Sequence, residues 1–247
     1  MNAIRLTAWE RPAELVDVPV PEPGPGEVLV RVSGAGLCHS DLHLMHWREG
    51  SMPYELPFTL GHEVAGTVAA LGPGADGIEP GEPVLVYGPW GCGRCPACSV
   101  GAEHLCERPG RGRGAGLGRD GGLAEYLVVP SPRLTVPLDG LDPVAAAPLA
   151  DAGLTPYHAV RRALGLLGPG ATAVVIGAGG LGHVAVQLVK ALSSARVVAV
   201  DRRLDRAADR AFEAQYEVQP EGHVRRHAGD NSTFPDLTSV RVVPFPT

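Results

Sequence analysis

The stretch TAVVIGAGGLGHVAVQLVKAL, residues 172–192, decides the fold of the second half of the chain. It opens with a short apolar run, continues through a glycine-rich turn and closes with apolar residues at helical spacing. Another apolar run follows at residues 196–200. A strand, a helix and a second strand in this order form a βαβ unit, because parallel strands need a long crossover. We therefore expect a parallel-sheet domain that begins near residue 150.

The turn within this stretch carries Gly177, Gly179 and Gly182 at the spacing G-x-G-x-x-G. Between a strand and a helix, this spacing permits a tight turn and lets a pyrophosphate approach the helix N-terminus. Asp201 follows the next strand, where its carboxylate would accept hydrogen bonds from adenosine ribose hydroxyls. A 2′-phosphate would meet this negative charge, although Arg202 beside it would soften the discrimination. The pattern predicts a dinucleotide site that favours NAD over NADP, with a solvated strand-end aspartate as the alternative for Asp201.

Short apolar segments punctuated by Gly and Pro predict strands in the first part of the chain. These segments are residues 4–9, 15–18, 28–35, 64–71, 84–87 and 124–129. They indicate an all-β, barrel-like body. Helical patterns follow at residues 142–150, 155–167, 181–192 and 204–211. Residues 213–247 lack a sustained apolar period, so we expect no continuation of the α/β domain there.

Composition and charge exclude several classes of protein. The 247 residues are 45% hydrophobic and 19% charged, with a formal charge of −6, which argues against disorder and against non-specific binding to nucleic acid or anionic lipid. No secretory signal is visible at the N-terminus. Residues 163–189 carry no formal charge, but glycines and Pro169 interrupt them, so we expect no membrane span. A cytoplasmic protein without a nucleic-acid or membrane partner is expected.

Four of the five cysteines, Cys92, Cys95, Cys98 and Cys106, follow the spacing C-x2-C-x2-C-x7-C. In a cytosolic protein such a cluster indicates a metal rather than disulfides. Four thiolates can surround one Zn²⁺ at about 2.3 Å each, and a closed site of this kind is structural because it leaves no position for a substrate. An iron–sulfur cluster is the main alternative, and a nucleic-acid-binding zinc module is a minor one.

The fifth cysteine, Cys38, lies in GAGLCHSDLH at residues 34–43, and His62 lies in GHEVAG at residues 61–66. A cysteine and a histidine from separate loops, joined by a third ligand, can form an open zinc site that accepts water or a substrate oxygen. Each residue alone is a weak signal, because a lone cysteine after a strand is more often a small buried apolar side chain.

Four motifs in this order and separation resemble the zinc-dependent medium-chain alcohol dehydrogenases. They are CHSDLH at residues 38–43, GHEVAGTVAALGPGA at 61–75, the four-cysteine segment, and VVIGAGGLG at 174–182. The resemblance covers about residues 1–212 and is strongest to bacterial secondary-alcohol dehydrogenases with an aspartate as third zinc ligand. It implies a mixed α+β and α/β fold: a GroES-like β-barrel catalytic domain at residues 1–150, a partial Rossmann domain at 151–212, and an unassigned divergent tail at 213–247.

The resemblance also implies a role for each matching residue of the catalytic domain. Cys38, His62 and Asp151 would bind a catalytic zinc, and Glu63 would stand behind the metal as an alternative or outer ligand. Asp41 would orient His62 through its other ring nitrogen.

A proton relay and a cofactor site follow from the same resemblance. Ser40 would take the alcohol proton and pass it through ribose hydroxyls toward His43, unless Ser40 merely caps a helix starting at Asp41 and His43 is a surface residue. His39 would lie near the cofactor pyrophosphate and Thr155 near the nicotinamide. The remaining cofactor-binding residues would be Gly177, Gly179, Gly180, Leu181, Gly182, Asp201 and Arg202.

The implied activity is the oxidation of secondary or a broad range of alcohols to ketones or aldehydes with NAD, supported by two Zn²⁺ per chain, one catalytic and one structural. A small alcohol or ketone is the implied substrate, and a homo-oligomer is a possible assembly. Relatives continue through further strands of the nucleotide domain, so we expect a truncated chain, with a catalytically silent zinc-binding remnant as the alternative. A missing sheet should leave residues 173–176 and 197–200 exposed and favour oligomerisation.

Overall fold

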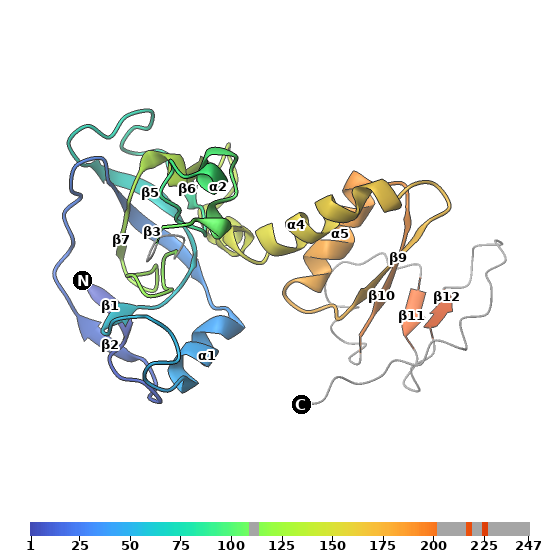
Figure 1. Cartoon of the computed structure of the whole chain (residues 1–247), viewed down its shortest axis with the longest axis horizontal. Coiled ribbons are helices and arrows are strands. Elements are labelled where there is room, and N and C mark those ends of the chain that lie inside the picture. Colours follow the sequence, from blue (N-terminus) through green and yellow to red (C-terminus); the bar gives the residue numbers. More distant parts are fainter. Residues whose placement is uncertain (109–113, 202–215, 219–223, 227–247) are drawn as a thin grey trace. The chain divides into compact units, whose positions relative to one another are not determined.

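A computed structural model of the chain (Figure 1) describes residues 1–108, 114–201, 216–218 and 224–226. The chain divides into two compact units, Met1–Asp151 and Ala152–Thr247. This division falls one residue from the domain boundary expected after residue 150. The predicted helix at residues 204–211 and Arg202 lie outside the described residues.

A five-stranded antiparallel sheet forms the centre of the first unit, with the strand order β7-β3-β5-β6-β8. Its strands are β3 (Val28–Gly36), β5 (Glu63–Leu71), β6 (Pro83–Val86), β7 (Tyr126–Val129) and β8 (Thr135–Pro137). The longest pairing joins β3 to β5, from Val28 opposite Leu71 to Gly36 opposite Glu63. This register places the end of β3 beside the start of β5, and both ends lead directly into predicted site residues.

Alternating apolar residues of these strands build the main core of the unit. Val28 and Val30 of β3, Val64 and Val68 of β5, and Leu127 of β7 are all buried in one cluster. Successive side chains of a strand point to opposite faces, so this alternation fixes which face of the sheet is covered. The barrel-like body expected from the apolar segments is confirmed.

A smaller sheet and the first helix complete the body of this unit. The sheet has the order β2-β1-β4, formed by β2 (Glu14–Asp17), β1 (Asn2–Leu6) and β4 (Phe58–Thr59). Helix α1 (His39–His46) contributes Leu44 to a second buried cluster with Leu6, Phe58 and Leu60. Burial of Leu44 therefore holds the helix that follows Cys38 in place.

Short helices connect the remaining parts of the first unit. They are α2 (Pro96–Ser99) and the 3-10 turns η1 (Glu103–Leu105) and η2 (Pro132–Leu134), followed by α3 (Pro143–Ala146) and η3 (Ala147–Ala150). The helix expected at residues 142–150 is thus an α-helix that tightens into a 3-10 turn. Asp142 caps it by accepting a hydrogen bond from the backbone N–H of Ala145. Pro148 cannot donate to an α-helical ladder, which accounts for the change.

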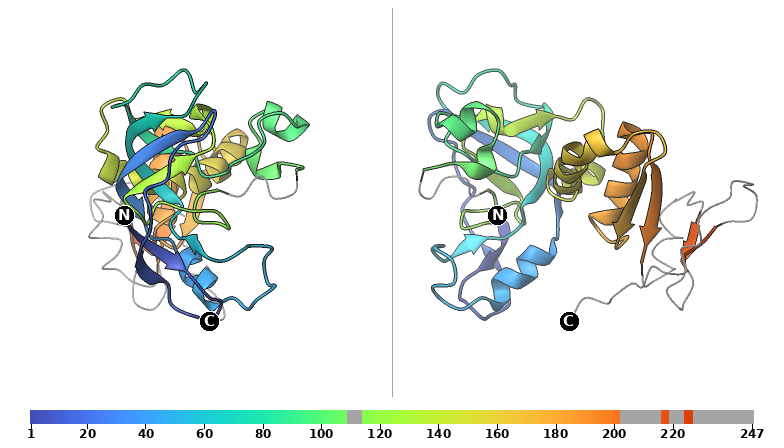
Figure 2. Two further views of the ribbon diagram at one scale, coloured as in Figure 1. Left: turned by 90° about the vertical axis from the view of Figure 1, so that its left-hand side faces the viewer. Right: turned by 45° about the vertical axis from the view of Figure 1, so that its right-hand side comes forward.

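The second unit contains the predicted βαβ arrangement. Strands β9 (Thr172–Ile176) and β10 (Arg196–Val200) pair in parallel, and α5 (Gly182–Leu192) connects them. Helix α5 packs against both strands and against α4 (Leu154–Ala163), which continues into the 3-10 turn η4 (Leu164–Leu166). Figure 2 shows α4 and α5 beside the two parallel strands. The predicted partial Rossmann fold is therefore present in this unit.

Two further strands lie in the segment expected as a tail. Strands β11 (Tyr216–Val218) and β12 (Val224–Arg226) pair antiparallel, so they do not continue the parallel arrangement of β9 and β10. No helix in the described parts of the chain is long and apolar enough to span a membrane.

Strand β9 exposes part of its apolar side chains, as expected. Val174 is 55% exposed and Ile176 is 69% exposed. The same expectation is wrong for Val198 and Val200 of β10, which are buried. Strand β11 contacts β10, which accounts for the difference. The apolar surface available for association is therefore the Val174 and Ile176 face of β9.

Replacing Val174 and Ile176 together by Thr should weaken self-association of the chain, because it removes exposed apolar area without changing the β-branched shape. Sedimentation velocity over a range of concentrations measures this. Val198→Thr is the matched control: it buries a hydroxyl and should lower the free energy of unfolding by about 1–3 kcal/mol. A double variant that associates as strongly as the unmodified chain would contradict the prediction.

Candidate metal and cofactor sites

Three side chains from distant parts of the first unit converge on one point. Cys38 follows β3, His62 precedes β5 and Asp151 follows η3. The β3–β5 register brings the first two together. Cys38 Sγ lies 3.6 Å from Asp151 Oδ2, and His62 Nε2 lies 3.4 Å from the same oxygen. The three ligand atoms all lie within 4.8 Å of one another.

These separations fit a single tetrahedral cation. Zinc bonds of 2.0–2.3 Å place neighbouring ligand atoms about 3.3–3.8 Å apart, and thiolate, imidazole and carboxylate are all zinc ligands. Three protein ligands leave one coordination position for water or a substrate oxygen. His62 is buried, whereas Cys38 and Asp151 are half-buried. The arrangement is that of an open metal site.

The electrostatics of this point favour positive charge. Burial opposes a charge on His62, but hydrogen bonds with Asp151 and Asp41 outweigh it and raise the pKa of His62 to about 11. In the metal-free chain the imidazole is therefore protonated between the two carboxylates. A divalent cation would replace that proton, because an imidazole that ligates a metal is neutral.

Asp41 supports two of the three converging residues from behind. It is buried, and its Oδ1 lies 3.5 Å from His62 Nδ1, while its Oδ2 accepts a hydrogen bond of 2.9 Å from the Cys38 backbone N–H. Oδ1 also accepts a hydrogen bond from the Gly61 N–H. Burial raises the pKa of Asp41, but these hydrogen bonds with His62 and the backbone lower it overall. The geometry agrees with the orienting role predicted for Asp41.

Helix α1 starts earlier than the sequence suggested. Its first residue is His39 and its N-cap is Cys38, so the expectation that Ser40 caps a helix starting at Asp41 is wrong. Asp41 performs the capping contact instead, by accepting from the Cys38 N–H. Ser40 is exposed in the first turn, and its Oγ lies 3.7 Å from Cys38 Sγ. Its hydroxyl is thus beside the proposed metal site.

The relay partner His43 lies one turn along the same helix. Residues three apart share one face of an α-helix, so Ser40 and His43 lie on the same side of α1. His43 is exposed, and its ring meets that of His39 edge to face with centroids 4.8 Å apart.

Glu63 does not belong to the group whose ligand atoms converge. It is buried, and its carboxylate lies against Gly36: a Cβ added there would come within 1.9 Å of Glu63 Oε2. Glycine is therefore required opposite Glu63 at the end of β3. Of its two predicted roles, the outer one behind the ligands is compatible with this position.

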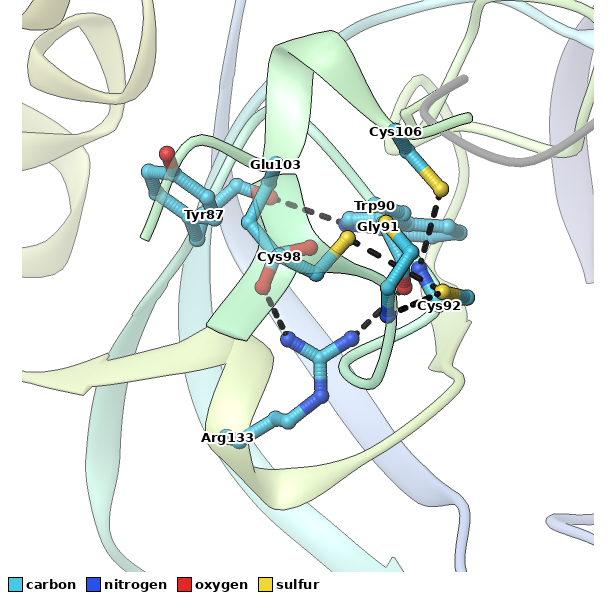
Figure 3. A network of polar contacts seen from close by, with 9 residues as sticks. Tyr87, Trp90, Gly91, Cys92, Cys98, Glu103, Cys106 and Arg133 are labelled. Atoms are coloured by element: carbon cyan, nitrogen blue, oxygen red, sulfur yellow. Dashed lines mark hydrogen bonds and ion pairs between the residues drawn. The ribbon is translucent and has the colours of Figure 1, made fainter. Parts of the chain in front are cut away.

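The four-cysteine segment also gathers its sulfur atoms. The Sγ atoms of Cys92, Cys95, Cys98 and Cys106 all lie within 4.8 Å of one another, and Cys92 Sγ is 4.0 Å from Cys98 Sγ. Two of these sulfurs accept backbone hydrogen bonds: Cys92 Sγ from the Cys95 N–H at 3.3 Å, and Cys106 Sγ from the Cys92 N–H at 3.4 Å (Figure 3). About 3.8 Å is the sulfur–sulfur spacing around tetrahedral zinc. The donor set fits a closed metal site.

The thiols of this segment differ in acidity. Hydrogen bonds from the backbone N–H groups of Arg94 and Cys95 lower the pKa of Cys92 to about 6. Burial, together with the neighbouring carboxylate of Glu103, raises the pKa of Cys98 to about 12. A bound metal would have to displace the proton of Cys98, since metals bind the thiolate.

The second unit contains a hollow of about 440 Å³ at the glycine turn. It is lined by Thr155, Pro156, Ala159, Ile176, Gly177, Gly179, Gly180, Leu181, Gly182 and Ala185. All predicted cofactor residues of the turn, and Thr155, thus meet in one place. Gly177 has a φ of 91°, and a Cβ on Gly182 would come within 1.6 Å of the Gly177 carbonyl oxygen. Both glycines are therefore sterically required.

Asp201 lies at the end of β10 and contacts the glycine turn directly. Its Oδ2 accepts a hydrogen bond of 2.6 Å from the Ala178 backbone N–H. This contact, which spacing alone did not reveal, gives Asp201 a part in holding the turn. Of the other predicted cofactor residues, His39 belongs to the first unit, and Arg202 lies beyond the described residues.

Comparison with known proteins agrees with these sites. The profile of the alcohol dehydrogenase GroES-like domain matches residues 24–140. An NAD-dependent alcohol dehydrogenase of Sulfurisphaera tokodaii is 43% identical over 211 residues, which are 82% of this chain and 59% of that protein. The crystal structure of the alcohol dehydrogenase from Aeropyrum pernix superposes with a TM-score of 0.76 at 39% identity, covering 85% of this chain and 63% of the other.

The chain belongs to the alcohol dehydrogenase family. A thermostable alcohol dehydrogenase from Pyrobaculum aerophilum, solved with cobalt and zinc bound, is similar as well, with a TM-score of 0.75 at 36% identity over 85% of this chain and 62% of that one. The chain spans about three-fifths of the length of the curated relatives it matches. Family membership thus rests on the barrel unit and the βαβ unit together.

Asp41→Asn should weaken metal binding at the Cys38, His62 and Asp151 site about 10- to 100-fold, because residues behind the ligands contribute that much to affinity. Competition with a chelator, followed by metal analysis, measures it. The four-cysteine site provides an internal control and should keep its ion. Equal retention at the first site in the variant and the unmodified chain would contradict the role of Asp41.

Proposed function

We propose that the chain is an NAD-dependent zinc alcohol dehydrogenase that oxidises secondary or a broad range of alcohols to ketones or aldehydes. The observation that carries this proposal is the convergence of Cys38, His62 and Asp151, with one coordination position left open. The glycine-lined hollow of the second unit supports a dinucleotide as the second reactant.

When bound, zinc would supply Lewis acidity toward the substrate oxygen, and NAD would accept the hydride. Cys38, His62 and Asp151 would hold the ion, while Asp41 keeps the imidazole in position from its far side. Because His62 is buried, its ring cannot turn to solvent, which keeps Nε2 directed at the open site.

Ser40 would accept the alcohol proton, since its hydroxyl lies beside Cys38 and is exposed. From Ser40 the proton would pass through the ribose hydroxyls of the cofactor to His43, on the same face of α1. The exposure of His43 allows it to release the proton to solvent. His39 and Thr155 would contact the pyrophosphate and the nicotinamide.

The four cysteines would hold a structural zinc, since their closed donor set leaves no position for a substrate. We further propose a cytoplasmic location, because five free thiols persist in a reducing compartment. A homo-oligomer would cover the exposed Val174 and Ile176 face of β9.

The purified full chain should contain about two zinc ions and form NADH from a panel of secondary alcohols. Metal analysis and absorbance at the NADH band measure the two properties. Ser40→Ala should lower kcat about 10²-fold or more while leaving the zinc content unchanged, because it removes a proton acceptor and not a ligand. Zinc without any NADH formation would contradict the proposal and favour a catalytically silent zinc-binding remnant.

Asp201 offers a test of cofactor choice that needs no turnover. Asp201→Ala should weaken NADH binding about tenfold, about 1.4 kcal/mol, because it removes both the ribose acceptor and the contact with Ala178. Asp201→Asn keeps an acceptor for the Ala178 N–H but loses the charge, so it should bind NADPH better than the unmodified chain does. Fluorescence titration with each cofactor measures both. Unchanged preference in Asp201→Asn would contradict the ribose role.

A further inference from the structure

A buried ion pair lies against the four-cysteine segment. Glu103 of η1 is buried, and its Oε1 accepts a hydrogen bond from Arg133 Nη1 of η2 at 2.5 Å (Figure 3). Arg133 comes from the barrel: its neighbour Leu134 is buried in the main core and accepts a hydrogen bond from the Tyr87 N–H. The pair therefore joins the cysteine segment to the barrel sheet.

The guanidinium of Arg133 holds the turn that carries Cys92. Its Nη2 donates a hydrogen bond of 2.6 Å to the carbonyl oxygen of Gly91. On the other side of Cys92, a Cβ added to Gly93 would come within 2.9 Å of Arg133 Nε, so the guanidinium lies close against that glycine. Gly93 also has a φ of 75°, which favours glycine. One side chain thus fixes the backbone before and after Cys92.

Glu103 reaches two of the other cysteines. Its carbonyl oxygen accepts a hydrogen bond of 3.1 Å from the Cys106 N–H. Its Oε2 and the Sγ of Cys98 both approach Gly91, at 1.8 Å and 2.5 Å from the position that a Cβ there would take. Oε2 is buried and makes no hydrogen bond of standard geometry within the described residues. The carboxylate and the Cys98 sulfur are therefore immediate neighbours.

The charges explain why the two partners occur together. Four thiolates around a divalent cation carry a net charge of −2, and a buried carboxylate beside them adds to this excess. The guanidinium of Arg133 offsets part of the charge and, as a planar fork, binds the Glu103 carboxylate and the Gly91 carbonyl oxygen at once.

We propose that the Arg133–Glu103 pair is a positioning device for the four-cysteine metal site, which presets Cys92, Cys98 and Cys106 for ligation and slows release of the ion. This inference rests on the structural zinc of the proposed function. It assigns a role to two residues that are not ligands and lie outside the open metal site.

The test measures zinc transfer from the full chain to a chromogenic chelator, in a Cys38→Ser background that leaves the four-cysteine site as the remaining one. Arg133→Met should release zinc about 10- to 100-fold faster. Arg133→Lys should fall between the two, because an ammonium lacks the planar fork that binds both acceptors. The Co²⁺-loaded variants should show altered thiolate charge-transfer bands, which a general loss of stability would not produce.

Arg5→Met is the matched control. Arg5 also joins a carboxylate and a backbone carbonyl, through Nη2 to Asp120 Oδ1 at 3.1 Å and to Pro57 O at 2.9 Å, but it lies away from the cysteines. Its zinc release should match that of the unmodified chain. The double variant Arg133→Met with Glu103→Met removes both charges and should recover thermal stability relative to Arg133→Met alone, without recovering slow release.

Release from Arg133→Met at the unmodified rate would overturn the inference. So would slow release from the double variant, or a four-cysteine site that holds no zinc at all. NADH formation by the chain with Cys38 intact is measured separately. A failure of the positioning role therefore leaves the proposed alcohol oxidation standing, and a failure of oxidation leaves the release rates interpretable.

Discussion

The pairing of β3 with β5 is the constraint on which the open metal site depends. Its register ends with Gly36 opposite Glu63, so Cys38 and His62 emerge on neighbouring strand ends although 23 residues separate them in the sequence. A register shift of one residue would turn every side chain of a strand to the other face. The buried valines of both strands resist such a shift and therefore also protect the geometry of the ligands.

Local motifs made much of this architecture predictable. The glycine turn between an apolar strand and a helix identified the βαβ unit, and the cysteine spacing identified a compact group of thiols, because both features depend on neighbours in sequence. The converging ligands were less accessible, since Asp151 lies 89 residues beyond His62. They were found through resemblance to a family and not through spacing.

Contacts between distant backbone and side-chain groups could not be predicted from the sequence. Asp41 was expected to orient His62, but its second bond, to the Cys38 N–H, depends on a helix that starts at His39 instead of Asp41. Asp201 was expected to face a ribose, and its bond to Ala178 appears only once β10 ends beside the glycine turn. Glu103 and Arg133 gave no signal at all, because a lone Glu and a lone Arg are ordinary surface residues in any pattern.

The short distance between Cys92 and Cys98 has a consequence for handling the protein. Two sulfurs 4.0 Å apart need only a small movement to reach bonding distance, and the Cys92 thiol ionises near neutral pH. Chain that has lost its ion would be open to oxidation in air and would then be unable to rebind a cation. Occupancy of this site thus doubles as protection against an irreversible loss of folded protein, and preparations need a reductant from lysis onward.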